Sequence, residues 1–285
     1  MKKFKSYHPI VNLIYFIFTI GFSCTFLHPV CLLTSLFCAI IVKEKSIGKN
    51  LLYLFPLIVF TALLNPLFNH QGKTVLLFLP GGNPLTLEAI IYGICAAIML
   101  VCVVLWFMHL GNVLTSDKFI YLFGRIIPAM SLILSMTLRY VPLFFSRLKA
   151  VENAQRCIGN DISSGSIGQR IKNGLSVLSI TVTWAFESSI DTADSMKARG
   201  YGLSKRTSFS LFSFEKKDGL SLFVILLLGF YVLLGSIKGV ISFQYFPCIR
   251  IPPLTAYSLS VHTAYFILLM FPLILKACEV RKWKS

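Results

Sequence analysis

Hydrophobic residues occur in long uninterrupted runs along this chain. Residues 6–42 contain no Lys, Arg, Asp or Glu, whereas a helix needs only about 20 apolar residues to cross a bilayer once. The run therefore predicts a hairpin of two transmembrane helices, over residues 10–27 and 30–42. We expect the turn between them at His28-Pro29.

Four further apolar runs follow, and each predicts one more span. They cover residues 51–68, 89–110, 220–237 and 251–275. Pro56 and Pro66 predict kinks or an early end in the third span. The segment 69–87 is rich in Gly and Pro and predicts a loop outside the membrane. The fold class is therefore an all-α polytopic membrane protein with about six transmembrane helices.

The hydrophilic part of the chain lies between the fourth and fifth spans. Residues 111–218 hold 14 of the 27 basic residues and 8 of the 11 acidic ones. This distribution divides the chain into an N-terminal membrane region of four spans (1–110), a cytoplasmic or interfacial region (111–218) and a C-terminal membrane region of two spans (219–285). We expect the middle region to carry the function.

Composition and charge agree with a membrane protein. Hydrophobic residues make up 56% and charged residues 13%, whereas soluble domains carry about 25% charged residues. The net charge of +16 does not indicate a nucleic-acid partner, because almost all basic residues lie on one side of the predicted membrane spans. With six spans, only Lys73, Lys238 and Arg250 lie on one side of the membrane, and the other basic residues lie on the opposite side. The positive-inside bias then predicts cytoplasmic N- and C-termini and a cytoplasmic middle region.

The middle region begins with an apolar segment that is too short to span. It occupies residues 126–138 between two arginines, and we expect Pro128 and Pro142 to break it. An amphipathic helix should follow and end at Gly159, because glycine suits the left-handed cap. Its apolar stripe consists of Phe144, Leu148, Val151, Ala154 and Ile158.

A second amphipathic helix is predicted over residues 179–199, ending at Gly200. At 100° per residue, Glu187, Asp191 and Asp194 share one face. The opposite face is apolar and consists of Val182, Phe186, Ile190, Ala193 and Met196.

The two helices end alike. Each combines a cation, a short side chain and a glycine, which would let a helix end approach a partner closely and meet its carboxylates. The same residues also suit an ordinary helix end, where cations complement the macrodipole and glycine forms the cap. The candidate docking residues are Arg156, Cys157, Ile158 and Gly159 in the first helix and Ala198, Arg199 and Gly200 in the second.

No catalytic, cofactor or metal site is predicted. The eight cysteines lack a CxxC pair and are interpreted as small core residues. The five histidines are interpreted as lacking a second ligand at helical spacing. The glycine pairs lack the GxxxxGK[ST] form of a phosphate loop.

Several segments together resemble the transmembrane T component of energy-coupling factor (ECF) transporters, the CbiQ/EcfT family. The segments are Leu114-Thr115 through Pro128, Thr137-Leu138-Arg139-Tyr140-Val141-Pro142, Ala154-Gln155-Arg156 and Asp194-Ser195-Met196-Lys197-Ala198-Arg199-Gly200-Tyr201-Gly202. The resemblance covers essentially the whole chain.

The resemblance implies a non-catalytic scaffold in the cell membrane. Its two cytoplasmic coupling helices would dock on two ABC-type ATPases, which bind the ATP. A substrate-binding membrane protein, the S component, would pack against it for uptake of a vitamin or a transition-metal ion. Arg199 would be the docking arginine of the second helix. In the first helix Ile158 stands where the family has arginine, and Arg156 lies two positions earlier, rotated by about 200°.

Two other functions remain open from the residues. The chain could be a permease that carries a solute alone. It could also be a membrane-embedded lipid or prenyl transferase, in which Glu187, Asp191 and Asp194 would bind a metal and a diphosphate. These carboxylates lack the tight DDxxD spacing of such enzymes.

Overall fold

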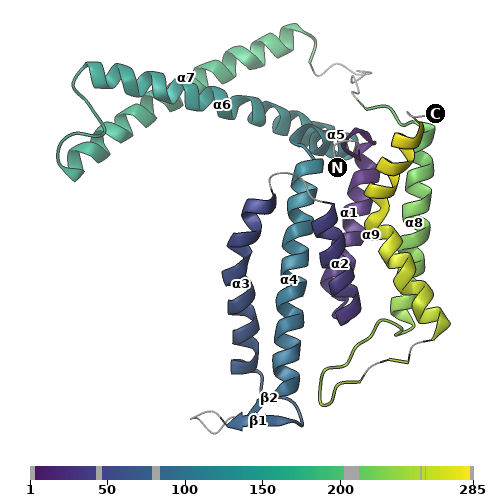
Figure 1. Ribbon diagram of the computed structural model, residues 1–285. Coiled ribbons are helices and arrows are strands. Elements are labelled where there is room, and N and C mark those ends of the chain that lie inside the picture. Colours follow the sequence, from purple (N-terminus) through teal and green to yellow (C-terminus); the bar gives the residue numbers. More distant parts are fainter. Residues whose placement is uncertain are drawn as a thin grey trace. The chain divides into compact units, whose positions relative to one another are not determined.

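The computed structural model is almost entirely helical (Figure 1). It forms two compact units, residues 1–119 with 212–285, and residues 120–211. We call them the membrane unit and the coupling unit. The all-α polytopic class is confirmed, whereas the division into 1–110, 111–218 and 219–285 stays a prediction. The structure describes residues 4–42, 47–78, 84–201, 212–250, 252–253 and 255–282.

Within its described residues, the membrane unit has a helix at the place of each of the six predicted spans. Three of them are long and apolar enough to cross a membrane, over Leu87–Val113, Lys216–Ile237 and Ala256–Leu275, and the other described spans are shorter apolar helices. The helices are α1 (Pro9–Thr25), α2 (Pro29–Ile41), α3 (Ile47–Phe68), α4 (Leu87–Val113), α8 (Lys216–Ile237) and α9 (Ala256–Lys282).

The predicted loop between α3 and α4 contains a small sheet that the sequence did not indicate. Strand β1 (Val75–Phe78) pairs with β2 (Pro84–Thr86) in antiparallel register. Glu88 ties this hairpin to α4, because Thr74 donates its hydroxyl to the Glu88 carboxylate at 2.7 Å. The loop is therefore anchored at the start of the helix.

Two histidine-proline pairs begin the helices of the first hairpin. The Nδ1 atoms of His8 and His28 each accept a hydrogen bond of 3.3 Å from the backbone N–H two residues later. In each case proline occupies the first helical turn, where its missing N–H costs nothing. The predicted turn at His28-Pro29 is thereby confirmed.

The core of the membrane unit holds polar groups that pair with one another inside the bundle. Trp106 and Tyr15 are fully buried, and the Tyr15 hydroxyl donates to the carbonyl of Leu269 at 3.0 Å. Trp106 donates its indole N–H to the Ser35 hydroxyl at 3.0 Å, and Ser35 lies 3.0 Å from the Ser23 hydroxyl. Such pairing is required because an unpaired polar group is costly in a bilayer.

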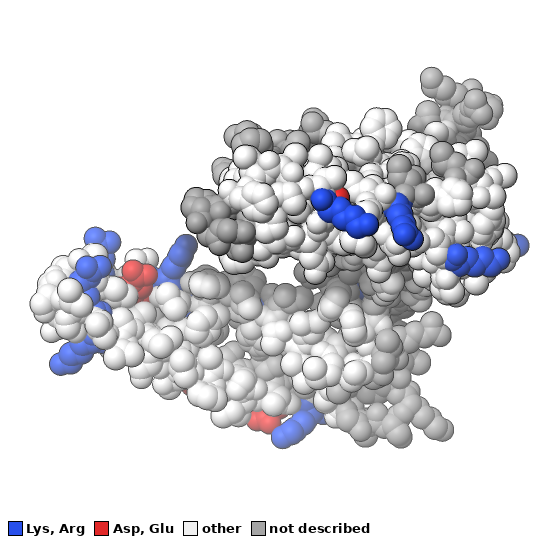
Figure 2. Space-filling view, turned by 90° about the horizontal axis from the view of Figure 1, so that it is seen from below, with Lys and Arg blue, Asp and Glu red and all other residues white. Residues whose placement is uncertain are grey.

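Apolar side chains also cover the outside of the membrane unit. On α8 they recur every three or four residues, and this stripe is far too apolar for a water-exposed helix. Figure 2 views the molecule from below and shows the charged side chains in small isolated groups among uncharged residues. The exposed stripe of α8 is interpreted as a lipid-facing surface. The exposed apolar side chains of α8 are Leu220, Phe223, Leu227, Phe230, Leu234 and Ile237.

The coupling unit is built on two long helices, α6 (Pro128–Cys157) and α7 (Ile167–Ala198), which pack against each other and cross (Figure 1). Helix α5 (Ser116–Ile126) precedes them. The predicted break at Pro142 is wrong, because α6 continues through it. A proline removes only one intrahelical hydrogen bond, and packing on a neighbouring helix offsets this loss.

Helix α7 begins earlier than the predicted residue 179. Ser166 caps it, since its hydroxyl accepts a hydrogen bond of 3.4 Å from the backbone N–H of Gln169. Gly165 precedes the cap with a φ of 93°. The start was missed because the first turns carry Gly168 and Gly174, which lower helix propensity.

Candidate docking site

The end of α6 is a Schellman motif. The N–H of Gly159 donates to the carbonyl of Arg156 at 3.1 Å, and the N–H of Asn160 donates to the carbonyl of Gln155 at 3.0 Å. Gly159 has a φ of 91°, which a residue with a side chain rarely adopts. Ile158 is therefore the C-cap residue, and 74% of it is exposed.

The end of α7 is built in the same way. The N–H of Gly200 donates to the carbonyl of Lys197 at 2.9 Å, and the N–H of Tyr201 donates to the carbonyl of Met196 at 3.0 Å. Gly200 has a φ of 76°. Arg199 is the C-cap residue and is exposed, as is Ala198 before it. The two predicted docking motifs thus have equivalent backbone geometry.

The cations next to the two caps differ in their partners. Arg156 and Cys157 are the last residues of α6 and are exposed. The Arg156 guanidinium pairs with the Asp161 carboxylate at 3.4 Å. A hydrogen bond from the backbone N–H of Ser163, together with this guanidinium, holds the pKa of Asp161 below its ordinary value. Arg156 is therefore directed toward its own loop.

Arg199 has no such partner within the described part of the chain. The nearby Lys197 forms an exposed ion pair of 3.7 Å with Asp194. A groove of about 450 Å³ lies beside the second cap, between α6 and α7. Arg139, Asp191 and Arg199 are its charged lining residues. Arg139 was not among the predicted docking residues, because only the packing of the two helices brings it beside Arg199.

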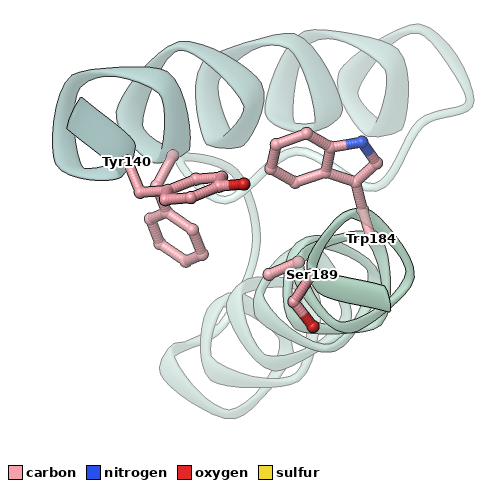
Figure 3. A pocket seen from close by; sticks show the side chains of 5 residues that line it. Tyr140, Trp184 and Ser189 are labelled. Atoms are coloured by element: carbon pink, nitrogen blue, oxygen red, sulfur yellow. The ribbon is translucent and has the colours of Figure 1, made fainter. Parts of the chain in front are cut away.

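Two contacts hold the helices together where they cross. The Tyr140 hydroxyl lies 2.6 Å from the Thr192 hydroxyl. The Arg147 guanidinium lies 5.1 Å from the centre of the Trp184 ring, a cation–π distance. Tyr140 and Trp184 point toward each other across a cavity of about 170 Å³ that Ser189 also lines (Figure 3).

The same contacts show that α6 and α7 run antiparallel. Tyr140 meets Thr192, and Arg147 meets Trp184, so residue numbers rise along one helix as they fall along the other. The two Schellman caps therefore point away from the crossing in opposite directions. The predicted docking residues form two separate sites, not one cluster.

The side of α7 that contacts α6 is not the predicted apolar face. The buried or half-buried residues facing α6 include Thr181, Trp184, Ser188 and Thr192. The apolar stripe lies about 120° away at 100° per residue, and it runs along the whole helix. Its exposed members are Ile167, Ile171, Leu175, Leu178, Val182, Phe186 and Ile190.

Helix α6 carries a similar exposed stripe, about 120° from its contact with α7 in the same rotational sense. On both helices the stripe lies about 120° from the helix–helix contact, counted in the same direction from the N-terminus to the C-terminus. Since the helices run antiparallel, both stripes lie on the same side of the pair. The acidic face of α7 lies on the other side. Over residues 130–145 of α6 the crossed pair is therefore apolar on one side and polar on the other, whereas Glu152 and Arg156 continue the direction of the stripe toward the end of α6. The stripe of α6 consists of Met130, Leu138, Val141 and Phe145.

A comparison with protein families identifies the family of this chain. The family described as CbiQ, cobalt transport protein, matches residues 8–211, which include most of the membrane helices and both caps. The chain belongs to the CbiQ family. The resemblance to the T component of ECF transporters is thereby confirmed.

Individual relatives of this CbiQ protein carry the name energy-coupling factor transporter transmembrane protein EcfT. The protein from Staphylococcus aureus is 32% identical over 112 residues, which are 39% of this chain and 42% of the relative. The protein from Lactobacillus helveticus is 35% identical over 101 residues, 35% of this chain and 36% of the relative. The protein from Leuconostoc gelidum is 28% identical over 199 residues, 65% of this chain and 72% of the relative. The chain thus spans about two fifths of the first relatives' length.

Proposed function

We propose that this chain is the energy-coupling membrane subunit of an ECF-type ABC importer in the cell membrane. Two ABC-type ATPases dock on the caps of α6 and α7, and an S component that binds the substrate packs against the apolar side of the crossed pair. The substrate is a vitamin or a transition-metal ion. ATP is bound by the ATPases, and this chain acts as the mechanical link.

The observation that carries the proposal is the pair of equivalent caps at opposite ends of one crossed helix pair. Each cap exposes its C-cap side chain, Ile158 or Arg199. Two similar sites suit two similar subunits. When the ATPases move relative to each other, the crossed helices transmit the displacement as rigid elements.

The two sides of the crossed pair support the assignment of the partners. An apolar stripe as long as that of α7 is unfavourable in water and suits the bilayer or another membrane protein. The polar side carries Arg139, Asp191 and Arg199 around one groove. Charged groups of this kind suit the surface of a soluble ATPase and give the contact its specificity.

The test is affinity purification of the tagged chain from native membranes in mild detergent, followed by mass spectrometry. We expect two ABC ATPases and a small membrane protein with the wild type. Arg199→Glu should lower recovery of the ATPases at least about tenfold, because a charge reversal at a buried interface costs several kcal/mol. Lys172→Glu is the matched control, since Lys172 is exposed on α7 outside both caps and should change nothing.

The alternatives predict other results. Recovery of the chain without ATPases from wild-type membranes would favour a permease that acts alone. Metal-dependent transferase activity of the isolated chain, lost in Asp191→Asn, would favour the enzyme. Equal ATPase recovery with Arg199→Glu and Lys172→Glu would contradict docking at the second cap.

A further inference from the structure

Three potential metal ligands converge in the membrane unit. His28 caps the N-terminus of α2, Cys31 lies in the first turn of that helix, and His262 lies in the second turn of α9. One ligand atom from each residue lies within 4.8 Å of the other two. The three residues are therefore close enough for one ion to contact them all after small side-chain rotations.

His262 is oriented as a metal ligand. Its Nδ1 lies 2.7 Å from the carbonyl oxygen of Ser258. A carbonyl can only accept, so Nδ1 carries the proton and Nε2 keeps its lone pair. That Nε2 atom is buried and has no hydrogen-bond partner among the described residues. Metal-bound histidines usually donate their other N–H in this way.

Cys31 and His28 complete the donor set. Cys31 has a free thiol and is 1% exposed. The His28 ring is 8% exposed, and its centre lies 5.1 Å from that of His262.

The sequence contains a local signal for this cluster. His28-Pro29-Val30-Cys31 spaces two ligand types three residues apart, which places them on one side of a helical turn. Interpreting the cysteines as core residues hides this pair, although Cys31 supplies His28 with a second ligand at helical spacing. His262 comes from a distant part of the chain, and only the packing of α2 against α9 adds it.

The geometry points to a binding site for one divalent transition-metal ion of the Zn²⁺ class, formed by His28, Cys31 and His262. Two imidazole nitrogens and one thiolate suit Zn²⁺ and Co²⁺, whereas Mg²⁺ and Ca²⁺ prefer oxygen ligands. On binding, the Cys31 thiol loses its proton to solvent and a metal–sulfur bond forms. The fourth coordination position is left to water. The bound ion joins the start of α2 to α9 and stabilises the membrane unit.

The ligands are not equivalent. Nδ1 of His28 already accepts a hydrogen bond of 3.3 Å from the backbone N–H of Val30. Metal binding through either His28 nitrogen weakens this cap, because Nδ1 must then bind the metal or take up the ring proton. Metal binding to Nε2 of His262 breaks no hydrogen bond of the described residues. Removing His262 should therefore weaken metal binding more than removing His28.

The test uses the full-length chain in detergent, stripped of metal with a chelator and titrated with Co²⁺. Thiolate-to-Co²⁺ charge transfer and intense d–d absorption report a four-coordinate site with sulfur. We expect one equivalent per chain, displaced by Zn²⁺. Cys31→Ser should abolish the charge transfer, and His262→Gln should weaken binding at least about 100-fold, beyond the cost of losing an outer-shell partner. Cys38→Ser is the control, because Cys38 is also buried on α2 but lies outside the cluster.

The wild-type chain alone can overturn the inference, whatever the folding of the variants. Zn²⁺ should raise its thermal unfolding temperature, because a ligand that binds only the folded state stabilises it. Absence of stoichiometric Co²⁺ binding and of this shift would contradict the site. Unchanged charge transfer in a monodisperse Cys31→Ser protein would contradict it as well.

Discussion

Ile158 and Arg199 occupy the same position in two equivalent helix caps. Each is the residue before a glycine with positive φ, and each is exposed beyond the last helical turn. One is apolar and the other is a cation. The two candidate docking sites therefore share their backbone geometry and differ in the chemistry that they offer a partner.

This difference predicts that the first cap binds through apolar contact. Ile158→Asp should lower ATPase recovery in the affinity purification, because a carboxylate would replace the apolar side chain in a desolvated contact. Ile158→Val keeps the apolar character and should have little effect. The purification used for Arg199→Glu measures both. Full ATPase recovery with Ile158→Asp would show that the first cap makes no important contact.

Substitution of glycine by alanine should have opposite effects on stability at the helix caps and inside α7. Gly159→Ala and Gly200→Ala should each destabilise the coupling unit by about 1 kcal/mol, because alanine is strained at their φ values of 91° and 76°. Gly174→Ala, inside α7 with no atom near the new Cβ, should stabilise it by about 0.5–1 kcal/mol. Thermal unfolding in detergent measures the difference. A common sign for all three would contradict the assigned caps.

The crossing of the helices predicts an energetic coupling between Tyr140 and Thr192. The Thr192 hydroxyl donates to the Ser188 carbonyl at 2.7 Å, so the Tyr140 hydroxyl is the donor in the bond between them. Tyr140→Phe and Thr192→Val should each cost about 1 kcal/mol, and the double variant should cost less than their sum. A double-mutant cycle of unfolding free energies measures this coupling. Strict additivity would show that the two side chains do not interact in solution.

Sequence patterns predicted the membrane helices well because long apolar runs determine them directly. The turn at His28-Pro29 and the helix ends at Gly159 and Gly200 were also found, since each depends on residues within a few positions. Local signals failed at Pro142 and Gly174, where packing between α6 and α7 maintains helix against a weak propensity.

The remaining features depend on residues that are distant in the sequence. Arg139 joins Arg199 in one groove only because α6 and α7 pair antiparallel. The common apolar side of the two helices has the same origin, because a helical wheel gives the direction of a stripe on one helix and not the position of its neighbour. His262 likewise reaches His28 and Cys31 only through tertiary packing.

The membrane orientation gives a final prediction. The excess of basic residues in the middle region predicts that it is cytoplasmic, and Cys157 is exposed on the first cap. A membrane-impermeant maleimide should label Cys157 in inverted vesicles and not in intact cells, with Cys157→Ser giving the background. Lys238→Cys, introduced in the Cys157→Ser background at the C-cap of α8, should show the reverse pattern. Labelling of Cys157 in intact cells would invert the topology and place the caps out of reach of any cytoplasmic ATPase.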